Sequence, residues 1–176
     1  MRIISGQHRG RAILPPKGFS ARPTTDFAKE ALFNIIAVNF EVERLAVLDL
    51  FSGAGSISYE FASRGCRSVD SVELSFRHHA FIKKTAQALQ LRQMRCLRCD
   101  AFSFLASCAA TYDIIFADPP YDMEGVERIL QVAFERQLLA PDGWLILEHS
   151  KGKDFSLHPR FQERRSYGSV NFSIFQ

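Results

Sequence analysis

The chain has 176 residues and a net charge of +3, and 47% of its residues are hydrophobic and 23% charged. This length and balance suit a single globular domain with a sizeable core. No apolar run approaches the ~18 residues of a membrane helix, and the N-terminus lacks the apolar stretch of a signal peptide, so we expect a cytoplasmic protein that does not enter a membrane.

The positive charge is concentrated near the N-terminus. Six basic and two acidic residues give residues 1–30 a net charge of +4, which leaves −1 for the other 146 residues. A basic arm on a nearly neutral body is typical of proteins that bind a polyanion, nucleic acid above all. A solvated basic terminus without a partner is the other explanation of this feature.

The first predicted element is a small hairpin, formed by residues 2–5 and 11–14 around a charged, glycine-containing loop. Two prolines end it. Residues 22–26 then offer several N-caps for a helix, whose apolar side chains recur at helical spacing to about Phe40.

From residue 45 onward, predicted strands alternate with predicted helices. This alternation indicates βαβ units and a parallel sheet with helices on both faces. The last two strands flank Gly168-Ser169 and predict an antiparallel hairpin. The predicted strands are 45–51, 68–74, 96–100, 113–118, 144–148, 161–167 and 170–175, and the helices between them are 56–63, 75–90, 101–109 and 126–134.

The four cysteines predict no metal site. Cys96 and Cys99 form a lone C-x-x-C, and a zinc site needs two further ligands at suitable spacing, which the sequence does not supply. We expect these two residues to be buried thiols on a strand.

The tetrapeptide Asp118-Pro119-Pro120-Tyr121 ends the fourth strand abruptly, because proline lacks an N–H and fixes φ. The strand tip becomes a stiff turn with an acid at its start and an aromatic ring at its end. The carboxylate and a proline carbonyl can accept both hydrogens of an exocyclic amine, and the tyrosine ring can stack on a planar base. The motif predicts a slot for such a base, although a plain strand-end turn also fits it.

The first strand leads into a glycine-containing segment that starts at Asp49. Gly53 and Gly55 let the backbone approach a ligand closely, but Ser58 occupies the third glycine position of a dinucleotide fingerprint. Since ligands of open α/β sheets lie at the carboxyl ends of the strands, this segment is a candidate binding loop.

Acids also end the next strands. Glu73 can accept both ribose hydroxyls of a nucleoside, and Asp100 can accept a hydrogen bond from an adenine amine. Each acid alone is explained as well by a surface or helix-capping role. Four acids at corresponding ends of successive strands, Asp118 included, favour a common site.

These motifs resemble those of class I S-adenosylmethionine-dependent methyltransferases, and Asp-Pro-Pro-Tyr is similar to the motif of amino-methyltransferases. The N-terminal part resembles the RsmD family in particular. Phe27 departs from this family, many of whose members have a basic residue there. The segments that carry the family resemblance are Arg2-Ile3-Ile4-Ser5-Gly6, Arg9-Gly10-Arg11, Arg22-Pro23-Thr24-Thr25-Asp26, Glu30-Ala31-Leu32-Phe33-Asn34 and Tyr167-Gly168.

The resemblance implies a Rossmann-like fold with a mostly parallel seven-stranded sheet, helices on both faces, a C-terminal antiparallel hairpin and a small N-terminal β-hairpin. It also implies a division into a basic hairpin extension, residues 1–22, and a methyltransferase domain, residues 23–176.

RsmD enzymes methylate the N2 amine of a guanine in 16S ribosomal RNA, so the resemblance implies S-adenosylmethionine as cofactor and S-adenosylhomocysteine as product. The implied partner is the small ribosomal subunit or an assembly intermediate, bound by a monomer without a metal. The implied catalytic residues are Asp118, Pro119, Pro120 and Tyr121. The implied cofactor-binding residues are Asp49, Phe51, Gly53, Gly55, Glu73, Leu74, Asp100 and Ala101. The implied RNA-binding residues are Arg2, Arg9, Arg11, Arg22, Thr24 and Thr25.

Two other functions remain open on the sequence. DNA adenine or cytosine amino-methyltransferases can share Asp-Pro-Pro-Tyr, but the chain has no long insertion that could serve as a DNA target-recognition domain. A non-catalytic RNA-binding assembly factor on a methyltransferase scaffold is the second alternative, and the presence of every expected site acid argues against it.

Overall fold

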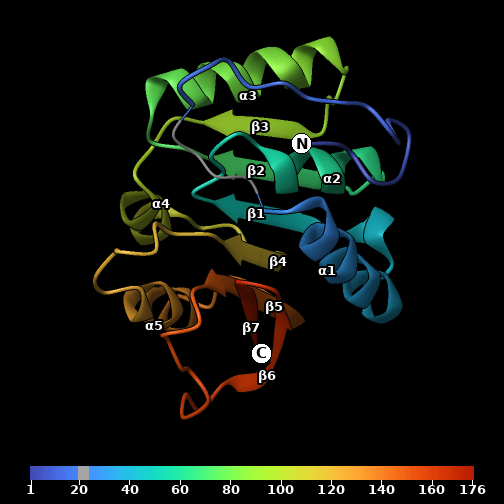
Figure 1. Cartoon of the computed structure of the whole chain (residues 1–176). Helices are drawn as coiled ribbons and strands as arrows, with labels where there is room; N and C mark the ends of the chain where they lie inside the picture. The colour runs from blue at the N-terminus through green and yellow to red at the C-terminus, as the bar shows by residue number, and fades with distance from the viewer. Residues whose placement is uncertain (20–23) are drawn as a thin grey trace.

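The computed structural model describes residues 1–19 and 24–176, which form a seven-stranded sheet between two layers of helices (Figure 1). The strand order is β3-β2-β1-β4-β5-β7-β6. β1 to β5 pair in parallel, and β7 pairs antiparallel with β5 and β6. This confirms the predicted α/β fold with its C-terminal hairpin. The strands are β1 Ala46–Leu50, β2 Ser68–Val72, β3 Met94–Leu97, β4 Tyr112–Ala117, β5 Leu139–His149, β6 Phe161–Tyr167 and β7 Val170–Phe175.

The helices cover both faces of the sheet, so its central strands are buried twice. Val47 of β1 packs into the cluster that includes α1, α2 and α3, while Leu48 and Leu50 pack into the cluster that includes α4 and α5. This explains why every residue of the strand except Asp49 is apolar. Nowhere in residues 1–19 or 24–176 is a helix long and apolar enough to span a bilayer. The helices are α1 Asp26–Asn39, α2 Ser56–Ser63, α3 Phe76–Ala88, α4 Ala101–Ser107 and α5 Glu127–Glu135, with a 3-10 turn at Val42–Arg44.

Two strands differ from their predicted bounds by more than two residues at one end. β3 ends at Leu97 instead of residue 100, so Asp100 belongs to the loop that follows it. β5 begins at Leu139 instead of residue 144, because a register shift against β4 accommodates the irregular segment that contains Pro141. Gly143 is required there, since a Cβ atom would lie 2.9 Å from the carbonyl oxygens of Ala140 and Asp113.

The N-terminal arm, residues 1–19, forms the predicted hairpin in reduced form, with one β-bridge between Arg2 and Ala12. The backbone amides of Ile4 and Ser5 donate instead to the two carboxylate oxygens of Glu60 on α2, at 2.8 and 3.0 Å. A side chain of α2 thus takes the place of a partner strand and fixes the arm to the body.

A buried ion pair completes this attachment. The Nζ atom of Lys29 lies 3.8 Å from Glu60 Oε2, and both side chains are almost fully buried. Lys29 also donates to the carbonyl oxygen of Arg2 at 2.6 Å and to Ser56 Oγ at 3.1 Å. Burial lowers the pKa of Lys29, and the charge of Glu60 opposes that shift. Because breaking such a pair leaves an uncompensated buried charge, the arm, α1 and α2 are held together as one unit.

Two glycines at the tip of the arm, Gly6 and Gly10, provide a test substitution and its matched control. Gly6 and Gly10 both have φ near +80°, but a Cβ atom on Gly6 would lie 1.8 Å from the carbonyl oxygen of Ser63, whereas Gly10 has open space. Gly10→Ala should lower the free energy of unfolding by about 1 kcal/mol through backbone strain alone. Gly6→Ala should lower it by at least about 2 kcal/mol more, because the arm must leave α2.

Urea denaturation measures both values, and hydrogen exchange at Gln7, whose amide donates to Ser63 O at 2.7 Å, reports on the arm directly. Equal losses of stability with unchanged protection of Gln7 would contradict this account of the arm.

Candidate active site

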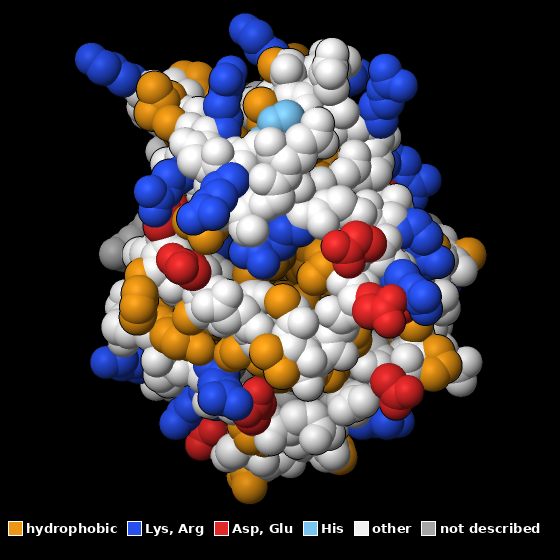
Figure 2. Space-filling model, turned by 90° about the vertical axis from the view of Figure 1, so that its right-hand side faces the viewer, with side chains coloured by type: hydrophobic (Ala, Val, Ile, Leu, Met, Phe, Trp, Pro, Cys, Tyr) orange, Lys and Arg blue, Asp and Glu red, His pale blue; other side chains and the backbone are white. Residues whose placement is uncertain are grey.

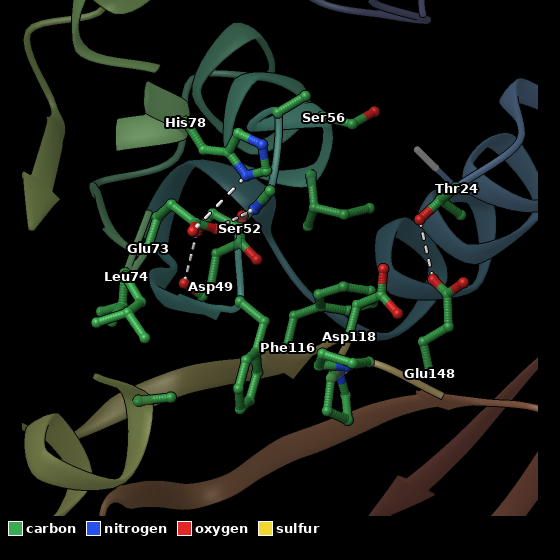
Figure 3. Close-up of a pocket in the computed structure, with 18 of the residues that line it drawn as sticks. Thr24, Asp49, Ser52, Ser56, Glu73, Leu74, His78, Phe116, Asp118 and Glu148 are labelled. Carbon is green, nitrogen blue, oxygen red and sulfur yellow. Dashed lines mark hydrogen bonds and ion pairs between the residues drawn. The ribbon is translucent and has the colours of Figure 1, made fainter. Parts of the chain in front are cut away.

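A cavity of about 630 Å³ lies at the carboxyl ends of β1, β2, β4 and β5 (Figure 3). None of the described residues that line it is Lys or Arg. The cavity therefore suits a ligand rich in hydrogen-bond donors or positive charge, and it does not suit a phosphate. The expected site residues that line it are Thr24, Thr25, Asp49, Phe51, Gly53, Glu73, Leu74, Asp100, Ala101, Asp118, Pro119, Pro120 and Tyr121.

Glu73 follows β2 and is held by the backbone on two sides. Its Oε2 atom accepts from the Gly53 amide at 2.8 Å, and its Oε1 atom accepts from the Ser75 amide at 2.7 Å. The Nδ1 atom of His78 lies 3.7 Å from Oε1. A carboxylate oxygen has room for more than one donor, so a fixed Glu73 can still accept hydroxyl groups from a ligand.

Asp49, on β1, points toward the start of α2. Its carboxylate accepts from both the backbone amide and the hydroxyl of Ser58. Burial raises the pKa of Asp49 to about 7, the hydrogen bonds from Ser58 and Ser52 oppose this shift, and the charge of Glu73 adds to it. A buried carboxyl group with so high a pKa gains from a ligand that brings donors or positive charge.

Asp118 stands directly after β4, at the mouth of the predicted slot. Burial raises its pKa well above the usual range, and the nearby charges of Glu148 and Asp49 raise it further. Pro119 is buried, whereas Tyr121 at the end of the slot is 44% exposed. The acid of the slot thus lies deep and its aromatic ring lies at the rim, as stacking on an entering base requires.

Sequence reasoning missed Glu148, which lies one residue before the end of β5 and is 3% exposed. Its Oε2 atom accepts from Thr24 Oγ1 at 2.9 Å, and its Oε1 atom accepts from Tyr121 OH at 3.4 Å. Burial raises the pKa of Glu148 to about 7, against the effect of these two hydrogen bonds. The rule that selected the other acids, a carboxylate at the carboxyl end of a strand, applies equally to this residue.

Two predicted cofactor-binding residues, Gly55 and Asp100, have structural roles at the start of a helix. Gly55, outside the lining of the cavity, precedes α2 with φ +83°, and a Cβ atom there would lie 2.7 Å from the Tyr59 ring. Asp100 lines the cavity and also caps α4, since its carboxylate accepts from the Ser103 amide at 2.8 Å.

A family model described as Conserved hypothetical protein 95 matches residues 1–176. YlbH of Bacillus subtilis, a candidate rRNA methyltransferase by name, is 36% identical over 86% of this chain and 83% of its own length. Ribosomal RNA small subunit methyltransferase D of Escherichia coli is 32% identical over 82% of this chain and 69% of its own length.

The chain belongs to this family, the RsmD family.

Solved methyltransferase structures share the fold of this chain. The candidate methyltransferase yhhF of Escherichia coli matches with a TM-score of 0.87 and 27% identity over 100% of this chain and 97% of its own. Coclaurine N-methyltransferase, solved with N-methylheliamine and SAH, matches with a TM-score of 0.56 and 26% identity over 72% of this chain and 36% of its own.

The expected RNA-binding residues of this RsmD-family chain fall into two places. Thr24 and Thr25 line the cavity, and Thr25 also caps α1 by accepting from the Ala28 amide. Arg9 and Arg11 are exposed on the arm, whose tip lies against the end of α2 at Ser63. Arg22 lies outside the described residues.

Two other residues bear on the RNA surface. Arg2 forms an ion pair with Asp26 at 3.7 Å. Phe27, where many family members have a basic residue, is 70% exposed, and its ring centroid lies 6.0 Å from that of Tyr167 in an edge-to-face arrangement. An aromatic pair thus stands where a cation was expected.

Only the tip of the arm is separated from the cavity by the length of α2, because Arg2 is bridged to Ser56 by Lys29 and Phe19 lies against His78, both beside the cavity. Eight residues of helix span about 12 Å, with Ser56 at the cavity and Ser63 at the arm. Figure 2 looks at the edge of the sheet away from the cavity and shows Lys and Arg side chains gathered on its upper part, over the arm and α3. A molecule that contacts both the tip of the arm and the cavity must therefore span at least the length of α2.

Asp49 generates a prediction about stability. Its pKa is higher in the folded protein, about 7, than the ordinary value of 3.8, so the folded state binds the proton more tightly. Stability from this group is present at low pH and is lost as pH rises from about 4 to about 7. Relative to Asp49→Asn, the wild-type protein should lose a few kcal/mol of unfolding free energy across this range.

Denaturation by urea at pH 4.5, 6 and 8 tests this, with the exposed Asp122→Asn as the control. Glu73 and Asp118 also carry charge into the site, so the difference between the wild-type and Asp49→Asn curves is the quantity to compare. Parallel curves for these two proteins would show that Asp49 is not the group that titrates.

Proposed function

We propose that the protein transfers a methyl group from S-adenosylmethionine to the exocyclic N2 amine of a guanine in small-subunit ribosomal RNA. The main support for this proposal is that one cavity contains two groups of residues, one suited to the cofactor and one suited to the target base. We call these groups the first and the second half-site. Figure 3 shows Asp49 and Glu73 on one side and Asp118, Glu148 and Thr24 on the other. Family membership supports the reaction class, and the chemistry of the slot supports the amine.

The first half-site fits S-adenosylmethionine, which supplies an electrophilic methyl group on a sulfonium centre when bound. Glu73, fixed by the Gly53 and Ser75 amides, would accept the ribose hydroxyls. Asp100 would accept from the adenine amine, and the exposed Leu74 side chain offers an apolar surface beside it. The cavity volume of about 630 Å³ lies within the usual range of ligand sites.

The second half-site fits an exocyclic amine. The amine of guanine is a poor nucleophile because its lone pair is delocalised into the ring. Asp118 and the carbonyl oxygen of Pro119 would accept the two amine hydrogens and turn the lone pair toward the methyl group. Alignment of this kind contributes several kcal/mol to lowering a barrier. Asp118 would also stabilise positive charge that develops on the nitrogen.

The two half-sites are adjacent because their strands are paired. Leu50 of β1 lies opposite Ala117 of β4 in the parallel register, so the segments after both residues leave the sheet side by side. Neighbouring strands are ~4.8 Å apart, which brings a group held after β1 within reach of Asp118. The target base must leave its stack to enter, and Tyr121 at the rim would stack on it.

The arm would bind RNA by charge. Phosphate contacts position a nucleic acid without reading its bases, and the exposed Arg9 and Arg11 lie about one length of α2 from the cavity. A large folded RNA can contact both surfaces at once. We therefore propose the small ribosomal subunit or a late assembly intermediate as the substrate, in preference to naked RNA.

Radiolabelled S-adenosylmethionine offered with small subunits, naked ribosomal RNA and DNA tests the function. Methylation of small subunits at a guanine, mapped by mass spectrometry, is the expected result. Transfer to DNA alone would favour a DNA amino-methyltransferase, and binding of particles without transfer would favour a non-catalytic assembly factor.

Asp118→Ala should reduce methyl transfer by at least about 100-fold, because the amine loses its charged acceptor. Its affinity for S-adenosylmethionine should stay within a few-fold of wild type, as calorimetry can show. Asp122→Ala, an exposed acid four positions along the chain, is the matched control and should retain wild-type turnover. Near wild-type turnover in Asp118→Ala would remove Asp118 from the reaction.

The double variant Arg9→Glu with Arg11→Glu should raise the KM for the particle. It should also reduce the slope of the logarithm of the binding constant against the logarithm of salt concentration by about 2, one unit for each lost phosphate contact. Cofactor affinity should not change. Arg44→Glu with Arg67→Glu reverses the same charge at two other exposed positions and is the control. An equal effect of both double variants would mean that only net charge matters.

A further inference from the structure

Glu148 is the buried acid of the cavity to which the reaction above gives no role. It connects three parts of the chain, since its carboxylate accepts from Thr24 before α1 and from Tyr121 in the slot, while Glu148 itself lies near the end of β5. Figure 3 shows its side chain beside Asp118. Its position is therefore fixed, and it lies in the half of the cavity proposed for the target base.

The pairing of β4 with β5 places the two acids next to each other. Ala117 lies opposite Leu147 in the parallel register, and each of these residues is followed by an acid, Asp118 directly after β4 and Glu148 on β5. Both acids are largely buried, and none of the described residues lining the cavity is Lys or Arg. Two adjacent carboxylates of this kind fit a ligand that presents several hydrogen-bond donors side by side along one edge.

Among the bases, guanine has such an edge. Its N1–H and its N2 amine present adjacent donors, whereas adenine and cytosine each place a ring-nitrogen acceptor next to their amine. If such a ring nitrogen faced the Glu148 carboxylate, two hydrogen-bond acceptors would face each other and no hydrogen bond would form. The pair of acids thus favours guanine and disfavours the two bases that DNA amino-methyltransferases modify.

We propose that Glu148 accepts the N1–H of the target guanine while Asp118 accepts from the N2 amine, so that Glu148 determines the choice of base. This inference rests on the proposed function, because it takes the N2 amine as the methyl acceptor. Thr24 and Tyr121 orient the carboxylate for this contact. Tyr121 thereby acquires a second role besides stacking, through its hydroxyl group.

The test changes both sides of the proposed contact. 2-Aminopurine keeps the N2 amine of guanine but lacks O6 and has an unprotonated N1, and it can replace the mapped guanine in a reconstituted small subunit. Because the loss of O6 is the same for the wild-type protein and for a variant of Glu148, the comparison of the two proteins isolates the contact with N1. The wild-type protein should methylate this particle at least about 100-fold less efficiently than the guanine particle, because a buried acceptor is left facing an acceptor.

Glu148→Gln supplies an amide that can donate to the unprotonated N1. The variant should lose kcat/KM on the guanine particle, and its preference for guanine over 2-aminopurine should shrink at least about 10-fold. Affinity for S-adenosylmethionine should be unchanged. Glu127→Gln, an exposed Glu on α5, is the control and should keep the wild-type preference.

The outcomes separate the two proposals. If the wild-type protein methylates no guanine N2 in the particle, the proposed function fails before Glu148 is tested. If it does, an equal loss on both particles in Glu148→Gln would show that Glu148 only supports Thr24 and Tyr121, which overturns the inference. Should the variant not fold, equal rates of the wild-type protein on the two particles would overturn it as well.

Discussion

The structure depends on burying several carboxylates at one edge of a sheet. Asp49, Asp118 and Glu148 are largely buried, and burial is the main reason that the pKa of each is raised. Backbone amides and hydroxyl groups of the protein donate hydrogen bonds to some of these carboxylate oxygens, as the Ser58 amide does to Asp49. The remaining acceptor capacity is left for a ligand. The fold thus keeps an acidic cavity that cationic and donor-rich groups stabilise, and the proposed reaction brings both kinds of group together there.

This constraint also explains the separation of the two binding surfaces. A cavity rich in acids repels phosphates, so in the proposed complex the RNA backbone would be held elsewhere while a single base enters. Arg9 and Arg11 are carried by the part of the arm that lies against the far end of α2 from the cavity. The buried pair of Lys29 and Glu60 keeps the arm in a fixed place relative to α2. Under the proposed function, such an arm would position a large substrate and leave the choice of base to the cavity.

The sequence predicted the order of the elements, the sheet and most of the cavity lining, because hydrophobic periodicity and strand-end acids are local signals. It did not reveal Glu148 as a site residue, since its importance comes from pairing with β4 and from Thr24, more than 120 positions away. Nor did it reveal the roles of Lys29 and Glu60, because a charged residue on a helix is ordinarily solvated. The resemblance supplied the family, and the assignments of individual cofactor and RNA contacts stay predictions.

The central claim is that one cavity holds the cofactor around Glu73 and presents its reactive end to Asp118. A crystal structure of the protein with S-adenosylhomocysteine tests it most directly. The account predicts that the ribose hydroxyls lie within hydrogen-bond distance, ~3 Å, of the Glu73 carboxylate, and that the sulfur atom faces the slot between Asp118 and Tyr121. A nucleoside bound against Asp118 and Glu148, or outside the cavity altogether, would contradict it.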